Sequence, residues 1–292
     1  IKEKKFTCSV AHDSEIHCDK CYEFLASEGV KLFDILSKDF GLSHRDMQIK
    51  FSGSRGMHFL IIAEDFRTMS SSERAALAEY IMGKGIVAEC VGFKPTMRRK
   101  KVIWEGPTTR QSGWHGRCAQ AVAEWLAKTE YPQMIDETGE EAISKRNAYI
   151  ISKAKRGQDM FKIASTGEWS KIFTPELSQN TMLTDISRIL DRAIKAYRVE
   201  LDTKVTVDTK REFRIGNSIH GKSCLVAKVI KSKELSSFNP FKDALITGTG
   251  DMEVKLLKDM KDVPIGGNII SGAKDEKIKV PTGIALHFLA KN

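Results

Sequence analysis

The first 21 residues hold a group of side chains that can bind a metal ion. Cys18 and Cys21 form a Cys-x-x-Cys pair, Cys8 precedes them, and His12 and His17 lie between. The short turn in such a pair sets both sulfurs on one face of a tetrahedral zinc ion. Cys8 and one histidine complete four ligands, so the pattern predicts a structural zinc site rather than a group of free thiols. His12 is favoured over His17, because a residue next to Cys18 rarely binds the same ion without strain.

A second polar group lies in a glycine-containing segment, residues 52–58, which reads Ser-Gly-Ser-Arg-Gly-Met-His. The glycines let the backbone approach a ligand closely. Ser52, Arg55 and His58 supply hydrogen-bond donors around an anion. Taken in isolation, the segment is either a phosphate-binding turn or, more commonly, an ordinary polar turn.

A third set begins at Asp202, whose carboxylate offers the hard oxygen ligand that a divalent cation prefers. Arg211 and Arg214 follow, and residues 218–222 read Ser-Ile-His-Gly-Lys, which would suit a triphosphate. The alternative is a solvated run of surface charge, and for this segment alone that alternative is favoured.

The surrounding sequence predicts the elements that position these groups. Residues 21–40 have the apolar spacing of an amphipathic helix, which Gly41 ends. Apolar residues alternate over residues 47–51, and a second strand is expected over residues 57–63. These two strands predict a β-hairpin with the Ser-Gly-Ser-Arg-Gly segment at its turn.

Residues 94–197 change in character to helices and basic linkers, with a cationic segment at residues 97–101. The clearest helical period covers residues 186–197. After it, strands are expected at residues 205–207, 225–230 and 277–280. This order of elements predicts a helical subdomain inserted into an α/β core.

Composition narrows the class of protein. The 292 residues are 41% hydrophobic and 29% charged, with a net charge of +9, and a basic surplus suits a phosphate-bearing partner. No apolar run approaches membrane-spanning length. The sequence shows no secretory signal, so we expect a reducing compartment and no disulfide framework.

Taken together, the motifs resemble the catalytic small subunit of the archaeal/eukaryotic-type DNA primases. That family has a zinc knuckle, then Ser-Gly-x-Arg-Gly-x-His at a hairpin. Much later it has Asp-x-x-Val-Thr-x-Asp-x-x-Arg-x-x-Arg, followed by Ser-x-His-Gly-Lys. Residues 52–58 and 202–222 match in that order. The similarity spans nearly the whole chain, although residues 94–193 match only in position and character, and the histidine-containing knuckle resembles archaeal members.

The resemblance implies an α/β (α+β) fold: an archaeo-eukaryotic primase core with an RRM-like mixed sheet, a zinc knuckle and an inserted helical subdomain. The expected divisions are a knuckle at residues 1–24 within the core, a catalytic core at residues 25–95 and 199–292, and a mainly helical insert at residues 96–198.

The resemblance also implies roles for individual residues. Asp202 corresponds to the third catalytic carboxylate, which binds Mg²⁺ or Mn²⁺. The positions that hold the triphosphate of the incoming nucleotide correspond to Ser52, Arg55, His58, Arg214, His220 and Lys222. The family's first two carboxylates form an Asp-x-Asp pair upstream of the knuckle, and no such pair precedes Cys8. We expect that pair to precede residue 1, and we expect the chain as given not to polymerise.

The implied function is a DNA-directed RNA polymerase that makes short primers on single-stranded DNA for replication, by two-metal nucleotidyl transfer. Nucleoside triphosphates would be its substrates and a primase large subunit its partner in a heterodimer, with no membrane involved. It would act in the cytoplasm with the nucleoid if archaeal, or in the nucleus if eukaryotic. The alternatives are a primase-polymerase relative in DNA repair, or a non-catalytic zinc-containing nucleic-acid-binding protein.

Overall fold

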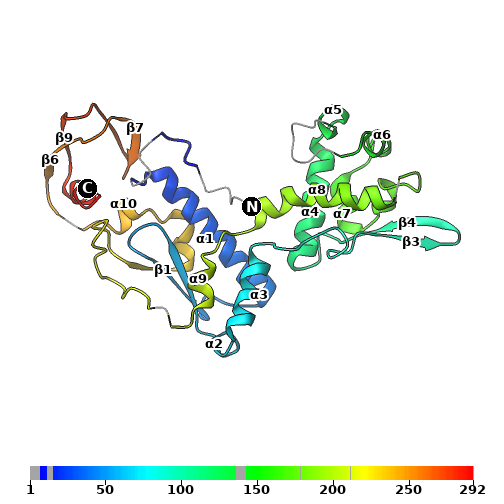
Figure 1. The fold of residues 1–292 in the computed structure, drawn as a ribbon, viewed down its shortest axis with the longest axis horizontal. Helices are drawn as coiled ribbons and strands as arrows, with labels where there is room; N and C mark the ends of the chain where they lie inside the picture. Colours follow the sequence, from blue (N-terminus) through cyan, green and yellow to red (C-terminus); the bar gives the residue numbers. More distant parts are fainter. Residues whose placement is uncertain are drawn as a thin grey trace. The chain divides into compact units, whose positions relative to one another are not determined.

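The computed structural model describes residues 7–11, 16–135, 143–177, 179–210, 212–246 and 248–291 (Figure 1). The chain divides into two compact units. Unit 1 comprises Ile1–Ser37, Gly41–Ser71 and Asp208–Asn292, and unit 2 comprises Lys38–Phe40 and Ser72–Val207. Residues 72–95 thus group with the helices of unit 2, whereas the sequence analysis placed them in the catalytic core. The division into a knuckle, a catalytic core and a helical insert stays a prediction. None of the helices in the described ranges has both the length and the apolar character needed to cross a membrane.

Unit 1 begins with a long helix and a small antiparallel sheet. Helix α1 (Asp19–Phe40) ends where Gly41 adopts a left-handed conformation (φ 69°) that its lack of a Cβ permits. Strand β1 (Met47–Phe51) lies between β2 (Met57–Ile61) and β5 (Lys228–Ile230). Every second residue of β1 is buried, as the alternation in the sequence requires.

The rest of unit 1 comes from the C-terminal part of the chain. Its further elements are α2 (Glu64–Arg67), the 3₁₀ helix η2 (Ser232–Ser237), α10 (Pro240–Asp243), β6 (Asp251–Lys255), β7 (Met260–Ile265), β8 (Asn268–Gly272), β9 (Lys277–Pro281) and α11 (Thr282–Leu289). Strands β6 and β9 pair, as do β7 and β8, and each ladder in the described part of the chain is antiparallel. Tyr22, Phe51, Phe241 and Ile284 lie in one core. That core joins α1, β1, α10 and α11.

Unit 2 is mainly helical. Its elements are α3 (Ser71–Ile81), β3 (Lys94–Arg98), β4 (Lys101–Glu105), α4 (Gly113–Lys128), α5 (Tyr131–Met134), α6 (Lys145–Ala154), α7 (Met160–Thr166), the 3₁₀ helix η1 (Trp169–Lys171), α8 (Gln179–Tyr197) and α9 (Thr203–Val207). Helix α4 packs against α7 and α8 through fully buried residues such as Val122, Ala164 and Leu190. Trp104, Trp169 and Phe173 form an aromatic cluster in the same core.

The α+β class expected from the sequence is confirmed, as are the helix over residues 21–40, the β1–β2 hairpin and the helix over residues 186–197. The strand expected at residues 205–207 is wrong, because this segment is the short helix α9. Only the last three residues of the strand expected at 225–230 form a strand, whereas Leu225 and Val226 make isolated bridges. The β3–β4 hairpin, which includes the cationic segment, was not predicted.

Candidate metal centre and nucleotide-binding loops

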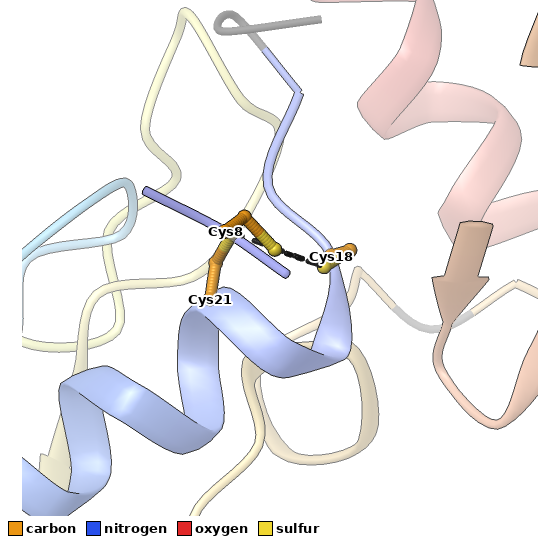
Figure 2. Close-up of side chains that lie close together, drawn as sticks. All are labelled: Cys8, Cys18 and Cys21. Carbon is orange, nitrogen blue, oxygen red and sulfur yellow. Dashed lines mark hydrogen bonds between the residues drawn. The ribbon is translucent and has the colours of Figure 1, made fainter. Parts of the chain in front are cut away.

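Three cysteines converge beside the start of α1 (Figure 2). The Sγ atom of Cys18 lies 3.5 Å from that of Cys8 and 3.8 Å from that of Cys21, and all three lie within 4.8 Å of one another. Zinc–sulfur bonds of about 2.3 Å in a tetrahedral site put neighbouring sulfurs about 3.8 Å apart. The three thiols therefore fit three corners of a tetrahedral metal site.

The first turn of α1 holds this group in place. Cys18 is the N-cap residue of α1 and has an extended backbone. Its side chain and that of Cys21 lie on the same side of the first turn of the helix, with their sulfurs 3.8 Å apart. Asp19, next to Cys18, is only 8% exposed. Its carboxylate accepts hydrogen bonds from Asn239 Nδ2 (2.8 Å) and from the backbone N–H groups of Gly266 and Gly267 (both 3.0 Å). These bonds anchor the turn that carries Cys18 and Cys21 to the C-terminal part of unit 1.

Burial favours the protonated form of the thiols. It raises the pKa of Cys18, and it raises the pKa of Cys21 to about 12. Without a cation both groups are therefore protonated at pH 7, and a bound metal ion would replace their protons. The favoured fourth ligand, His12, lies outside the described residues. The ring of the alternative, His17, lies 5.9 Å from the ring of Tyr22.

The turn between β1 and β2, residues 52–56, is organised by the first of the predicted phosphate-binding side chains. The Ser52 N–H donates to the carbonyl of Gly56 (2.9 Å), and Ser52 Oγ accepts from the N–H groups of Ser54 (3.3 Å) and Gly56 (3.2 Å). Ser52 therefore shapes the backbone of the turn, while Arg55 at its tip is exposed. We call this segment the β1–β2 turn.

Residues 218–224, which we call the His220 loop, pack directly against the β1–β2 turn. A Cβ atom at Gly53 would lie 2.8 Å from the Cβ of His220, so only glycine fits this approach. The Ser223 hydroxyl donates to the Gly53 carbonyl across 170 residues of sequence. On the other side, the Tyr22 hydroxyl donates to the carbonyl of Ser54 (3.0 Å). The turn is thus held between α1 and the His220 loop.

The His220 loop is a tight turn with several positive charges around it. The Lys222 N–H donates to Nδ1 of His220 (3.3 Å), which leaves Nε2 as the protonated nitrogen of a neutral ring. Burial is the largest cause that lowers the pKa of His220, and the charges of Arg214, Lys291 and Lys222 add to it. The ring is therefore neutral at pH 7, in a cationic environment that favours an anion.

The remaining predicted residues fall in two places. The ring of His58 on β2 makes an edge contact with Phe213 (centroids 5.1 Å apart), next to the exposed Arg214. Asp202 belongs to unit 2, where its Oδ1 atom accepts from the N–H groups of Lys204 (3.1 Å) and Val205 (3.3 Å) and caps α9. Arg211 lies outside the described residues.

Comparison with known proteins agrees with this arrangement. Residues 10–232, which include Cys18, Cys21 and both loops, match the family described as DNA primase small subunit. The chain belongs to this family. The resemblance that the three motifs suggested is therefore confirmed.

Curated relatives of this primase-family chain are archaeal DNA primase small subunits named PriS. The one from Methanococcoides burtonii is 25% identical and matches 81% of this chain and 61% of its own length. The one from Methanocella arvoryzae is 31% identical over 75% of this chain and 57% of its own length. For Nitrosopumilus maritimus the identity is 25% over 100% of this chain and 66% of the relative. The chain thus spans about three fifths of the relatives it matches.

The sequence analysis did not identify two residues of this primase-family chain that support the loops. His287 on α11 is fully buried and its Nδ1 lies 2.7 Å from the Ser223 carbonyl, to which it donates. Ser223, also fully buried, holds the β1–β2 turn through Gly53. A histidine within an apolar helix looks like any core residue, so the pattern of the sequence carries no signal for this contact.

Proposed function

We propose that this chain is the nucleotide-binding part of a primase catalytic small subunit, a nucleotidyltransferase that makes primers on single-stranded DNA for replication. The observation that carries the proposal is the packing of the β1–β2 turn on the His220 loop. It joins the two motifs whose side chains and backbone N–H groups suit a triphosphate. Nucleoside triphosphates would be the substrates.

The chemistry of this site follows from its donors. The Nε2–H of His220 can donate to a phosphate oxygen while the ring stays neutral, and Arg214 and Lys222 supply positive charge beside it. Arg55 on the β1–β2 turn and His58 on β2 belong to the segment that packs against the His220 loop. A phosphate group at this position would receive charge-assisted hydrogen bonds from both segments.

The proposal includes two kinds of metal ion. We assign the three cysteines, with His12 or His17, to a structural zinc, because their sulfur spacing suits that ion. We assign Asp202 to a catalytic Mg²⁺ or Mn²⁺, held together with the further carboxylates that the resemblance implies. Such ions activate the attacking hydroxyl and stabilise the leaving pyrophosphate.

The proposed protein and nucleic-acid partners are inferred from the relatives. The relatives are named as small subunits, so we propose a heterodimer with a primase large subunit, acting on single-stranded DNA in an archaeal cytoplasm.

The test is nucleotide binding by this chain, which requires no polymerisation. Lys222→Ala should weaken the affinity for a nucleoside triphosphate by about 1–3 kcal/mol, which is about 5- to 150-fold. Lys261→Ala, which removes an exposed charge elsewhere in unit 1, should leave the affinity unchanged. Equal affinities for the Lys222 variant and the unaltered chain would refute the proposed site. They would favour the alternative of a non-catalytic zinc-containing nucleic-acid-binding protein.

A further inference from the structure

The β3–β4 hairpin of unit 2 carries an unusual group of charges at its tip. Arg98 ends β3 and pairs with Lys101, which begins β4. Arg99 and Lys100 form the two-residue connection, and all four side chains are exposed. Figure 1 shows this hairpin extending away from the helices of its unit. The tip therefore concentrates four basic residues on one short protrusion.

The backbone of the tip is strained by its own sequence. Arg99 and Lys100 have φ angles of 47° and 64°, in the left-handed region. Two-residue hairpin turns of this kind strongly prefer Asn-Gly, because other residues clash there. Residues such as Arg and Lys are rarely found in this conformation. The like charges of Arg98 and Lys101, directly opposite each other, also repel.

Of the four charges at the tip, only that of Arg98 has an acidic partner in the described part of the chain. Arg98 bonds to Glu105 Oε1 (2.7 Å), and Lys94 lies 3.6 Å from the other oxygen of the same carboxylate. In the described ranges of the chain, Arg99, Lys100 and Lys101 take part in no ion pair. Residues that disfavour their own backbone conformation and repel one another are typical of functional sites, where function outweighs local stability.

The base of the hairpin, in contrast, is fixed. Trp104 on β4 is 1% exposed and its ring packs 5.9 Å from that of Phe173. Its backbone N–H donates to Ser170 Oγ (2.8 Å), and the same hydroxyl donates back to the Trp104 carbonyl (3.0 Å). The core of unit 2 thus holds the hairpin at a defined angle, with its charged end in solvent.

We propose that the tip of the β3–β4 hairpin binds the sugar–phosphate backbone of a nucleic-acid strand. Phosphates are the anions that a row of exposed arginine and lysine side chains recognises without regard to base sequence. Arginine can bind a phosphate through two parallel hydrogen bonds. Arg99 and Lys100 are neighbours in the turn and both are exposed. The inference rests on the proposed function only in taking the strand to be the template or the primer–template duplex.

A double substitution separates binding from folding. Arg99→Asn with Lys100→Gly removes both charges and gives the turn its preferred residues, so thermal stability should stay the same or rise. Each phosphate contact contributes about 0.7 to the slope of log K against log salt for a single strand. The variant should therefore bind a single-stranded oligonucleotide more weakly, with a slope smaller by about 1.4. A duplex of the same sequence, titrated in parallel, identifies which form the tip contacts.

The matched control is Lys128→Gln with Arg156→Gln, which removes one exposed charge at the end of α4 and another in the turn after α6, both in the same unit. Its slope should equal that of the unaltered chain. If the Arg99/Lys100 variant also keeps that slope for both strand forms, the inference is wrong. Failure of an unaltered chain to bind either form would overturn both the inference and the template part of the proposed function. Nucleotide affinity in the hairpin variant should be unchanged, so a failed Lys222 test would count against the nucleotide site alone.

Discussion

Substitution of Gly53 by alanine adds only one methyl group, but it should strongly destabilise the proposed nucleotide site. Gly53 has a φ angle of 84°, and alanine in such a conformation costs about 1–2 kcal/mol. The new Cβ would also lie 2.8 Å from His220 Cβ, 3.2 Å from the Leu225 carbonyl oxygen and 3.3 Å from the Ala227 nitrogen. Two of these neighbours are backbone atoms that cannot rotate away, and overpacking of this kind adds about 1–3 kcal/mol. We expect a total loss of about 2–5 kcal/mol in the free energy of unfolding.

The same substitution should weaken nucleotide binding, because relief of the clash moves the His220 loop away from the β1–β2 turn. We expect a loss of about tenfold in affinity, equivalent to one charge-assisted hydrogen bond of about 1.5 kcal/mol. Gly250→Ala is the matched control: its φ angle is 88°, but nothing lies within 4 Å of the added carbon. That variant carries only the conformational cost and should bind nucleotide normally. Urea unfolding and nucleotide titration measure both quantities. If Gly53→Ala and Gly250→Ala behave alike in both assays, the contact between turn and loop does not have the role assigned to it.

Two further predictions concern the metal centre and α11. Metal analysis should find about one zinc per chain, and Cys18→Ser should lower this content whereas exposed Cys90→Ser should not. Burial lowers the pKa of His287 from 6.5 to about 4, so the unfolded chain binds the proton more tightly. Stability from this group is therefore fully present above pH 6.5 and lost as pH falls toward 4, by about 3 kcal/mol in all. Urea unfolding across this range should show that loss in the unaltered chain and not in His287→Gln. An equal pH dependence in both would contradict the assignment.

Residue types and local spacing were enough to predict the β1–β2 hairpin and the Cys-x-x-Cys turn. Both depend on interactions within a few residues: alternating burial along β1, and two thiols one turn apart at the start of α1. The packing of Gly53 on His220 could not be read from either motif. It joins positions about 170 residues apart, and only the resemblance to a family brought them together.

The errors have local physical causes. Val205, Thr206 and Val207 favour a strand by their β-branched side chains. The Asp202 carboxylate overrides this preference by capping the first turn of α9. At the β3–β4 hairpin, the turn uses Arg99 and Lys100 where a sequence-based prediction looks for Asn-Gly, so the cationic run resembles a linker.

The candidate metal centre and the two loops of the proposed nucleotide site are chemically separate, but they belong to one connected structure. Cys21 precedes Tyr22, a residue only 2% exposed, whose hydroxyl supports the β1–β2 turn at Ser54. The other face of that turn contacts the His220 loop through Gly53. A metal ion that fixes the first turn of α1 therefore also fixes one side of the proposed triphosphate site, without touching the nucleotide. We therefore predict that removal of the proposed zinc weakens nucleotide binding indirectly, because the turn rests on Tyr22 and Tyr22 directly follows Cys21.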